Sequence, residues 1–263
     1  MLLKSKKQVM VEKRNGEKEP YNPKKLRNSL RRVSANSHEI DHILKNVNKI
    51  LYNGIKTEKL FKFVHDELKK SNQGVCCRYN LKKSMIDLRI HGGYTYEKFM
   101  AKILEKQGYK VELNKIAKGK FITHEVDITA KKGKETLMVE AKHHNKPWLG
   151  ESIQTALYVQ ARFLDLNKKF TKPMLVTNTK FSHQVRKYSK GVGMKLMGWK
   201  YPKNDSLEKN IEKYGLYPIS VLELNKKLLD SYLKKDIITI DQLIKTNISQ
   251  KLKDRIKLIL NTK

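Results

Sequence analysis

The stretches His124-Glu125-Val126-Asp127-Ile128 and Leu137-Met138-Val139-Glu140-Ala141-Lys142 decide how the middle of this chain is expected to fold. Both are rich in apolar residues, and Lys132-Gly133-Lys134 between them is typical of a turn. We therefore predict a hairpin of two antiparallel strands, over residues 121–130 and 136–142. The second strand begins with a continuous apolar run, which is typical of a buried central strand. Two charged residues at the end of such a strand indicate a functional site.

This hairpin would place Asp127 and Glu140 side by side, and the two-residue period of a strand puts Glu140 and Lys142 on one face. Paired carboxylates suit a hard divalent cation, Mg²⁺ or Mn²⁺. A neighbouring lysine can orient or deprotonate a water for attack on phosphorus. A structural salt bridge is the alternative, since a similar triplet occurs at Glu67-Leu68-Lys69 in a helical stretch.

The elements around the hairpin alternate between helix and strand. Apolar spacing predicts helices over residues 96–104, 149–166 and 181–189, and strands over residues 109–113, 174–177 and 195–199. The order α-β-β-β-α-β, followed by α-β, favours the α/β (α+β) class, with helices flanking a sheet.

Two polar residues border the apolar faces of these helices. Glu97 can reach the sheet as a third acid, although a glutamate on a helix flank is ordinarily solvated. Gln160 stands in an apolar stripe, where its amide must find partners. A core glutamine with satisfied hydrogen bonds is the alternative.

Composition indicates the kind of partner. The chain of 263 residues carries 57 Lys and Arg against 26 Asp and Glu, a formal net charge of +31. Such a charge favours a polyanion, and we predict DNA, with a generally lysine-rich composition as the alternative. No apolar run is long enough for a membrane helix, and the start lacks a signal-peptide core. The two cysteines are adjacent, which excludes a disulfide framework, so we expect a cytoplasmic protein without a membrane partner.

Two breaks divide the chain into three predicted domains, residues 1–90, 91–205 and 206–263. His91-Gly92-Gly93 separates two helical stretches, and Tyr201-Pro202-Lys203-Asn204-Asp205 ends the last strand of the middle domain. Two short strands and then helices are expected in the first domain. The tail is helical by its apolar spacing.

The middle domain resembles the PD-(D/E)xK nucleases, and among them the Mrr-like restriction endonucleases, with Holliday-junction resolvases as a neighbouring branch. The resemblance rests on the element order, on Gly93-Tyr94-Thr95-Tyr96-Glu97, Gln107-Gly108-Tyr109-Lys110-Val111 and Glu140-Ala141-Lys142-His143-His144, and on Asp127 and Gln160. Val126 stands where the family has a proline. The resemblance implies a Mg²⁺-dependent DNA endonuclease. Glu97, Asp127 and Glu140 would hold the metal, and Lys142 and Gln160 would complete the catalytic set.

The first domain resembles the ATP-cone, over residues 8–90. The resemblance rests on Val11-Glu12-Lys13-Arg14-Asn15-Gly16, Leu51-Tyr52-Asn53-Gly54-Ile55-Lys56-Thr57 and Arg78-Tyr79. It implies a module that binds ATP or dATP as a signal, without hydrolysis. The phosphates would lie at Lys13, Arg14, Lys25 and Thr57, and the nucleoside at Glu19, Asn22 and Leu26. The alternative is a basic helical domain that docks on DNA.

The tail resembles a helix-hairpin-helix, with Asp236 where that hairpin usually has glycine. Such a unit would grip the DNA backbone. Two alternatives to the DNA endonuclease stay open: a catalytically inactive, ATP-responsive DNA-binding regulator, and an RNA-processing nuclease. A homodimer is a further open partner.

Overall fold

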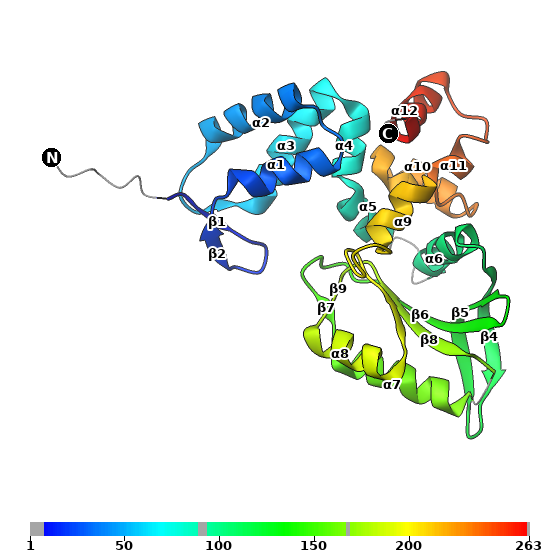
Figure 1. Ribbon diagram of the computed structural model, residues 1–263. Coiled ribbons are helices and arrows are strands. Elements are labelled where there is room, and N and C mark those ends of the chain that lie inside the picture. Colours follow the sequence, from blue (N-terminus) through cyan, green and yellow to red (C-terminus); the bar gives the residue numbers. More distant parts are fainter. Residues whose placement is uncertain (1–7, 89–93, 167–168, 262–263) are drawn as a thin grey trace. The chain divides into compact units, whose positions relative to one another are not determined.

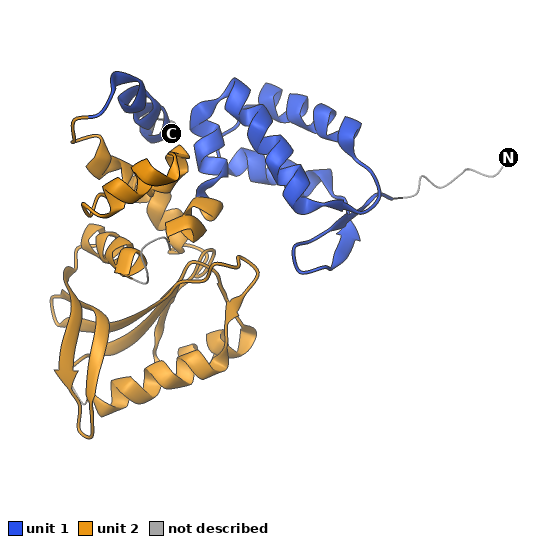
Figure 2. Ribbon diagram, turned by 180° about the vertical axis from the view of Figure 1, so that it is seen from behind, with its two compact units in different colours: residues 1–81, 248–263 blue, residues 82–247 orange. Residues whose placement is uncertain are grey.

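The computed structural model describes residues 8–88, 94–166 and 169–261. The chain forms two compact units, coloured separately in Figure 2: unit 1 comprises residues 1–81 and 248–263, and unit 2 comprises residues 82–247. The predicted linker at His91-Gly92-Gly93 lies outside the described residues.

Unit 2 is built on a five-stranded sheet in the order β10-β8-β6-β5-β4 (Figure 1). Strands β4, β5 and β6 are antiparallel neighbours, whereas β6, β8 and β10 run parallel. Figure 1 shows α6 over one face of the sheet and α7 and α8 over the other. The bounds are α5 Leu81–Asp87, α6 Tyr94–Lys106, β4 Lys110–Lys118, β5 Thr123–Lys132, β6 Glu135–Lys142, β7 Gly150–Glu151, α7 Ile153–Asp165, β8 Lys172–Thr177, β9 Lys180–Phe181, α8 His183–Val192 and β10 Lys195–Met197.

The element order and the mixed α/β class are confirmed. Helix α6 ends close to Gly108, whose φ of +90° turns the chain into β4 and suits glycine. Core residues Met138, Val159 and Leu175 pack together between the sheet and its helices.

The bounds of several elements differ from the sequence-based prediction, and two of these differences have a clear physical cause. Phe121 and Ile122, predicted to begin a strand, lie in the β4–β5 turn and are 78% and 63% exposed. The Asp165 carboxylate holds this turn by accepting the backbone N–H of Phe121 at 2.9 Å. Helix α7 begins at Ile153, later than predicted, because Gly150–Glu151 pair with β9 as a short strand.

Unit 1 joins a three-stranded sheet, in the order β2-β1-β3, to a set of helices. Asn22 caps α1 by accepting the N–H of Lys24 at 2.9 Å, and Asn36 forms a capping box with Glu39 at the start of α2. The bounds are β1 Met10–Glu12, β2 Lys18–Pro20, α1 Pro23–Arg32, α2 Ser37–Ile50, β3 Ile55–Lys56, α3 Thr57–Ser71, α4 Gln73–Tyr79 and α12 Gln250–Asn261.

The compact units divide the tail that the sequence predicts as one domain. Helix α12 belongs to unit 1, where it contacts α4. Ile256 and Ile259 are buried, which explains why α12 needs an apolar partner surface. The rest of the tail belongs to unit 2, and its bounds are α9 Leu207–Tyr214, the 3₁₀ helix η2 Ile219–Leu222, α10 Lys226–Leu233 and α11 Ile240–Leu243.

Asp236 lies between α10 and α11 with a φ of +58°. This is the left-handed region that favours glycine, in agreement with the glycine that the hairpin motif usually has there. The helix-hairpin-helix interpretation of this segment stays a prediction. In the described part of the chain, no helix combines the length and the apolar character that crossing a membrane requires.

Candidate active site

The β5–β6 hairpin brings Asp127 and Glu140 together. Ile128 pairs with Val139 in the antiparallel register, so the next pair outward is Asp127 with Glu140. The backbone N–H of Ala141 donates to Asp127 Oδ2 at 2.8 Å, which fixes the aspartate against β6. The geometry expected from the two stretches is therefore present.

Glu140 is buried, at 4% exposure, and bonds to two cations. Lys142 Nζ lies 2.7 Å from Glu140 Oε1, as expected for residues on one face of a strand. The guanidinium of Arg162, from α7, donates to Glu140 Oε2 and to the carbonyl of Glu125. A buried carboxylate of this kind needs such partners, because an unpaired charge in the interior is costly.

Sequence reasoning missed Arg162. The helical spacing could have placed it on the buried face of α7, because Arg162 follows the buried Ala156 and Val159 at three-residue intervals. An arginine at a core position of a helix requires an acidic or carbonyl partner.

Glu97, on α6, is half-buried and lies near Asp127 and Glu140. The side-chain amide of Asn114 donates to Glu97 Oε2 at 3.0 Å and to Glu125 Oε1 at 3.2 Å. Burial raises the pKa of Glu97, and the charges of Glu125 and Glu140 act in the same direction, against the bond from Asn114. The structure thus brings Glu97 within the electrostatic field of Glu140.

Asp127 is the acid most strongly affected by its surroundings. Burial, followed by the charge of Glu140 and then that of Glu97, raises its pKa to about 6. Crowded carboxylates with raised pKa values are typical of a cation site, since a bound cation relieves their repulsion. Within the described residues, however, no group of three or more His, Cys, Asp or Glu side chains is arranged to hold a metal ion.

Gln160 lies on α7 and is half-buried. Its Oε1 is buried and accepts no hydrogen bond in the described part of the chain. Such an atom calls for a partner, a water or a ligand. No contact described in the structure joins Gln160 to Asp127 or Glu140, so its place in the catalytic set stays a prediction.

In unit 1, the residues expected around a nucleotide form two groups. Glu19 lies 3.0 Å from both Lys13 Nζ and Lys25 Nζ. The bond from Lys25 has the larger effect and the bond from Lys13 the next, and together they lower the pKa of Glu19. A pocket of about 460 Å³ lies here, and its lining includes Glu19, Tyr21, Asn22 and Lys25.

The second group comes from the end of β1 and the start of α3. Parallel pairing of Glu12 with Lys56 brings the residues that follow them, Lys13 and Thr57, to one edge of the small sheet. Arg14 Nε lies 2.5 Å from Glu58. Leu26 is half-buried on α1, packed against the core of the unit.

A sheet flanked by helices, with two acids and a lysine at the end of a buried hairpin, is the architecture of the restriction-endonuclease-like class. Comparison with protein families agrees: the restriction endonuclease model matches residues 89–200, and the ATP cone domain model matches residues 9–81.

Relatives extend this comparison. An uncharacterized protein of Archaeoglobus fulgidus is 40% identical over 140 residues, which are 53% of this chain and 80% of that protein. The crystal structure of the protein of unknown function AF1548 is similar at 33% identity with a TM-score of 0.54, over 64% of this chain and 95% of that one. The MspJI restriction endonuclease in complex with a 27-mer oligonucleotide is 14% identical, with a TM-score of 0.39, over 69% of this chain and 39% of that one. This chain belongs to the same family as the Archaeoglobus fulgidus protein, and it contains an ATP cone domain followed by a restriction endonuclease domain.

Proposed function

We propose that this chain is a divalent-metal-dependent DNA endonuclease whose activity responds to ATP or dATP bound in unit 1. The observation that carries the proposal is the juxtaposition of Asp127, Glu140 and Lys142 at the end of a buried hairpin. The net charge of +31 supports a polyanionic substrate, because lysines and arginines bind the phosphates of a nucleic acid whatever its base sequence.

Asp127 and Glu140 are the residues that would hold the metal, with Glu97 as the third acid. Their carboxylate oxygens suit Mg²⁺ or Mn²⁺, and the raised pKa of Asp127 supports a cation partner. The metal would supply Lewis-acid polarisation of the scissile phosphate. Lys142 and Arg162 each bond to one oxygen of Glu140, so a bound ion would share these oxygens with them through the remaining lone pairs.

Lys142 is suited to orient the attacking water. Burial acts to lower its pKa, but the bond to Glu140 and the charges of Glu140 and Asp127 raise it above its usual value. The side chain is therefore an ammonium ion at neutral pH and can donate but not accept a proton. Of the two roles predicted for this lysine, orienting the water therefore fits better than deprotonating it, and an ammonium ion can in addition stabilise the charge of the phosphate.

The nucleotide would bind at the two lysines around Glu19. Lys13 and Lys25 would exchange the carboxylate for phosphate oxygens, which make similar charge-assisted hydrogen bonds. Arg14 and Thr57 would complete the phosphate site, while Asn22 and Leu26 would contact the nucleoside.

One observation favours a second candidate, a catalytically inactive DNA-binding regulator. Arg162 neutralises Glu140 from inside the domain, which is a stable alternative to a bound cation. This candidate predicts DNA binding without cleavage.

Cleavage assays distinguish these candidates. The full chain is incubated with linear, nicked, methylated and four-way-junction DNA and with matched RNA, in Mg²⁺ or in EDTA, with and without ATP. We expect cleavage of at least one DNA in Mg²⁺ only, at a rate that ATP changes. Binding without cleavage of any substrate would favour the regulator, and cleavage of RNA alone would favour the RNA-processing nuclease.

A further inference from the structure

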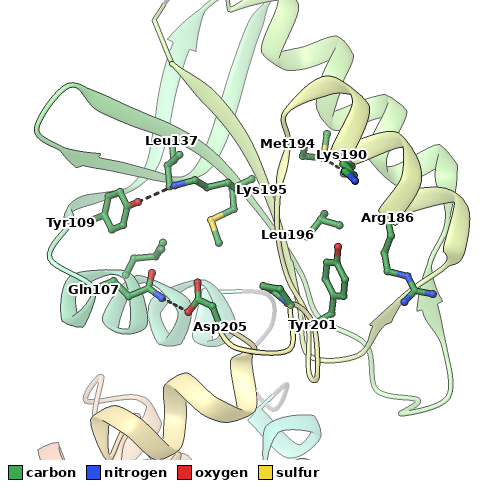
Figure 3. Close-up of a pocket in the computed structure, with 14 residues that line it drawn as sticks. Gln107, Tyr109, Leu137, Arg186, Lys190, Met194, Lys195, Leu196, Tyr201 and Asp205 are labelled. Atoms are coloured by element: carbon green, nitrogen blue, oxygen red, sulfur yellow. Dashed lines mark hydrogen bonds between the residues drawn. The ribbon is translucent and has the colours of Figure 1, made fainter.

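A pocket of about 360 Å³ lies in unit 2 near the end of α6, beside α8 and β10 (Figure 3). Its lining includes none of the residues assigned to the metal, to catalysis or to ATP. The volume falls in the range of about 300 to 1,000 Å³ that is typical of small-molecule sites.

The floor of this pocket is apolar. Leu104, Leu137, Met174 and Met194 are buried there, and Leu196 is half-buried. Leucine and methionine side chains pack well against a flat ring, because methionine adapts its shape to the ligand. The floor therefore suits a planar, uncharged group.

Two cations stand at one rim. Arg186 and Lys190 are four residues apart on α8, so they project from one face of the helix, and both are exposed. In the described residues neither forms an ion pair, although the Arg186 guanidinium lies 5.7 Å from the centre of the Tyr201 ring. Lys195 differs, because it bonds to Glu135 at 2.8 Å. Arg186 and Lys190 are thus available to an anion.

A carboxylate and an amide stand at the opposite side, as Figure 3 shows for Asp205 and Gln107. Asp205 Oδ1 accepts from the side-chain amides of Gln107 at 3.2 Å and Asn210 at 2.7 Å. These bonds hold the carboxylate in place. Asp205 Oδ2 takes no bond in the described part of the structure, which leaves an acceptor for an N–H group.

We propose that this pocket is a second nucleotide site, in which the base lies on the apolar floor with an N–H edge toward Asp205. The phosphate lies at Arg186 and Lys190, as an arginine and a lysine on one helix face suit an anion. A free nucleoside monophosphate and the terminal nucleotide of a strand present the same chemistry.

Calorimetry on the full chain tests it, in a Lys13→Ala/Lys25→Ala background that disables the proposed site in unit 1. The probe is guanosine 5′-monophosphate, whose base carries adjacent N–H donors. We expect one binding site in this background. Adding Arg186→Ala and Lys190→Ala should weaken it by about tenfold or more, the loss expected for charge-assisted hydrogen bonds. Lys187→Ala, on the same helix but outside the pocket, should have no effect.

Two further ligands complete the test. Ribose 5-phosphate, which lacks the base, should bind much more weakly, and binding as tight as that of the nucleotide would overturn the assignment. A 5′-phosphorylated dinucleotide identifies the source: tighter binding than the mononucleotide indicates a strand end, and weaker binding indicates a free nucleotide. Absence of binding, or full affinity without Arg186 and Lys190, would refute the proposal.

Discussion

Replacing Asp127 by asparagine should stabilise the nuclease unit at neutral pH while removing a proposed metal ligand. Burial, then the charges of Glu140 and Glu97, raise the pKa of Asp127 from the ordinary 3.8 to about 6. Each pKa unit corresponds to about 1.4 kcal/mol, so the shift sets an upper bound of about 3 kcal/mol. Because the side chain is only partly buried and solvent screens its charge, we expect a gain of about 1 to 2 kcal/mol.

The sign follows from the two titrations. The folded-state pKa lies above the unfolded value, so the charge opposes folding above about pH 6, where both states are ionised. Below about pH 4 both states are protonated and the penalty is absent. The asparagine can still accept the N–H of Ala141, which now bonds to Asp127 Oδ2 at 2.8 Å. The gain should therefore be full at pH 8 and vanish near pH 3.5.

Tryptophan fluorescence during urea unfolding measures this gain. Trp148 and Trp199 both lie in unit 2, so their signal reports on this unit. The assay is run in EDTA. Asp165→Asn is the control and should destabilise the unit at neutral pH. Burial acts to raise the pKa of Asp165, but the bonds from His124 and from the backbone of the β4–β5 turn outweigh it and lower that pKa. If Asp127→Asn gains no stability at pH 8, or gains as much near pH 3.5, the reasoning is refuted.

Three further predictions concern the nucleotide, the substrate and the buried ion pair. Lys13→Ala/Lys25→Ala should weaken ATP binding by about tenfold or more in calorimetry, and Lys18→Ala, exposed on the neighbouring strand, should leave it unchanged. The logarithm of the DNA-binding constant should fall by about 0.9 for each tenfold rise in salt and each phosphate contacted. A binding constant that does not change with salt would contradict a polyanionic partner. Arg162→Ala should lower the free energy of unfolding of unit 2 by about 3 kcal/mol in EDTA, because it leaves Glu140 without its buried partner. Mg²⁺ bound at Glu140 should restore part of this loss. An unchanged free energy of urea unfolding would contradict the ion pair.

The juxtaposition of Asp127, Glu140 and Lys142 could be predicted from sequence because strand geometry is local. Once the turn at Gly133 is placed, antiparallel pairing sets which residues face each other, and the two-residue period sets which share a face. The order of helices and strands between residues 94 and 197 could be predicted as well, because apolar periodicity is also a local signal. Glycine and proline positions also marked where helices begin and end.

The remaining features depend on contacts between distant residues. Arg162 reaches Glu140 across 22 positions, and Gln107 reaches Asp205 across 98. Helical spacing can place Arg162 on the buried face of α7, but it does not identify the partner in either pair. The division of the tail likewise depends on which surface covers the apolar face of α12, which its own periodicity does not specify. Asn114, which ties Glu97 to Glu125, has a φ of +48° within β4, a local irregularity that strand alternation does not predict.

The most direct test of the central claim is the rate of DNA cleavage by Lys142→Ala, measured in parallel with DNA binding. Lys134→Ala, an exposed lysine in the turn at the other end of the same hairpin, is the matched control. We predict that Lys142→Ala binds DNA like wild type but cleaves it at least about a hundredfold more slowly in Mg²⁺. Lys134→Ala should keep its rate, and wild type should lose activity in EDTA. Equal cleavage by wild type and Lys142→Ala, or undiminished cleavage in EDTA, would contradict the account.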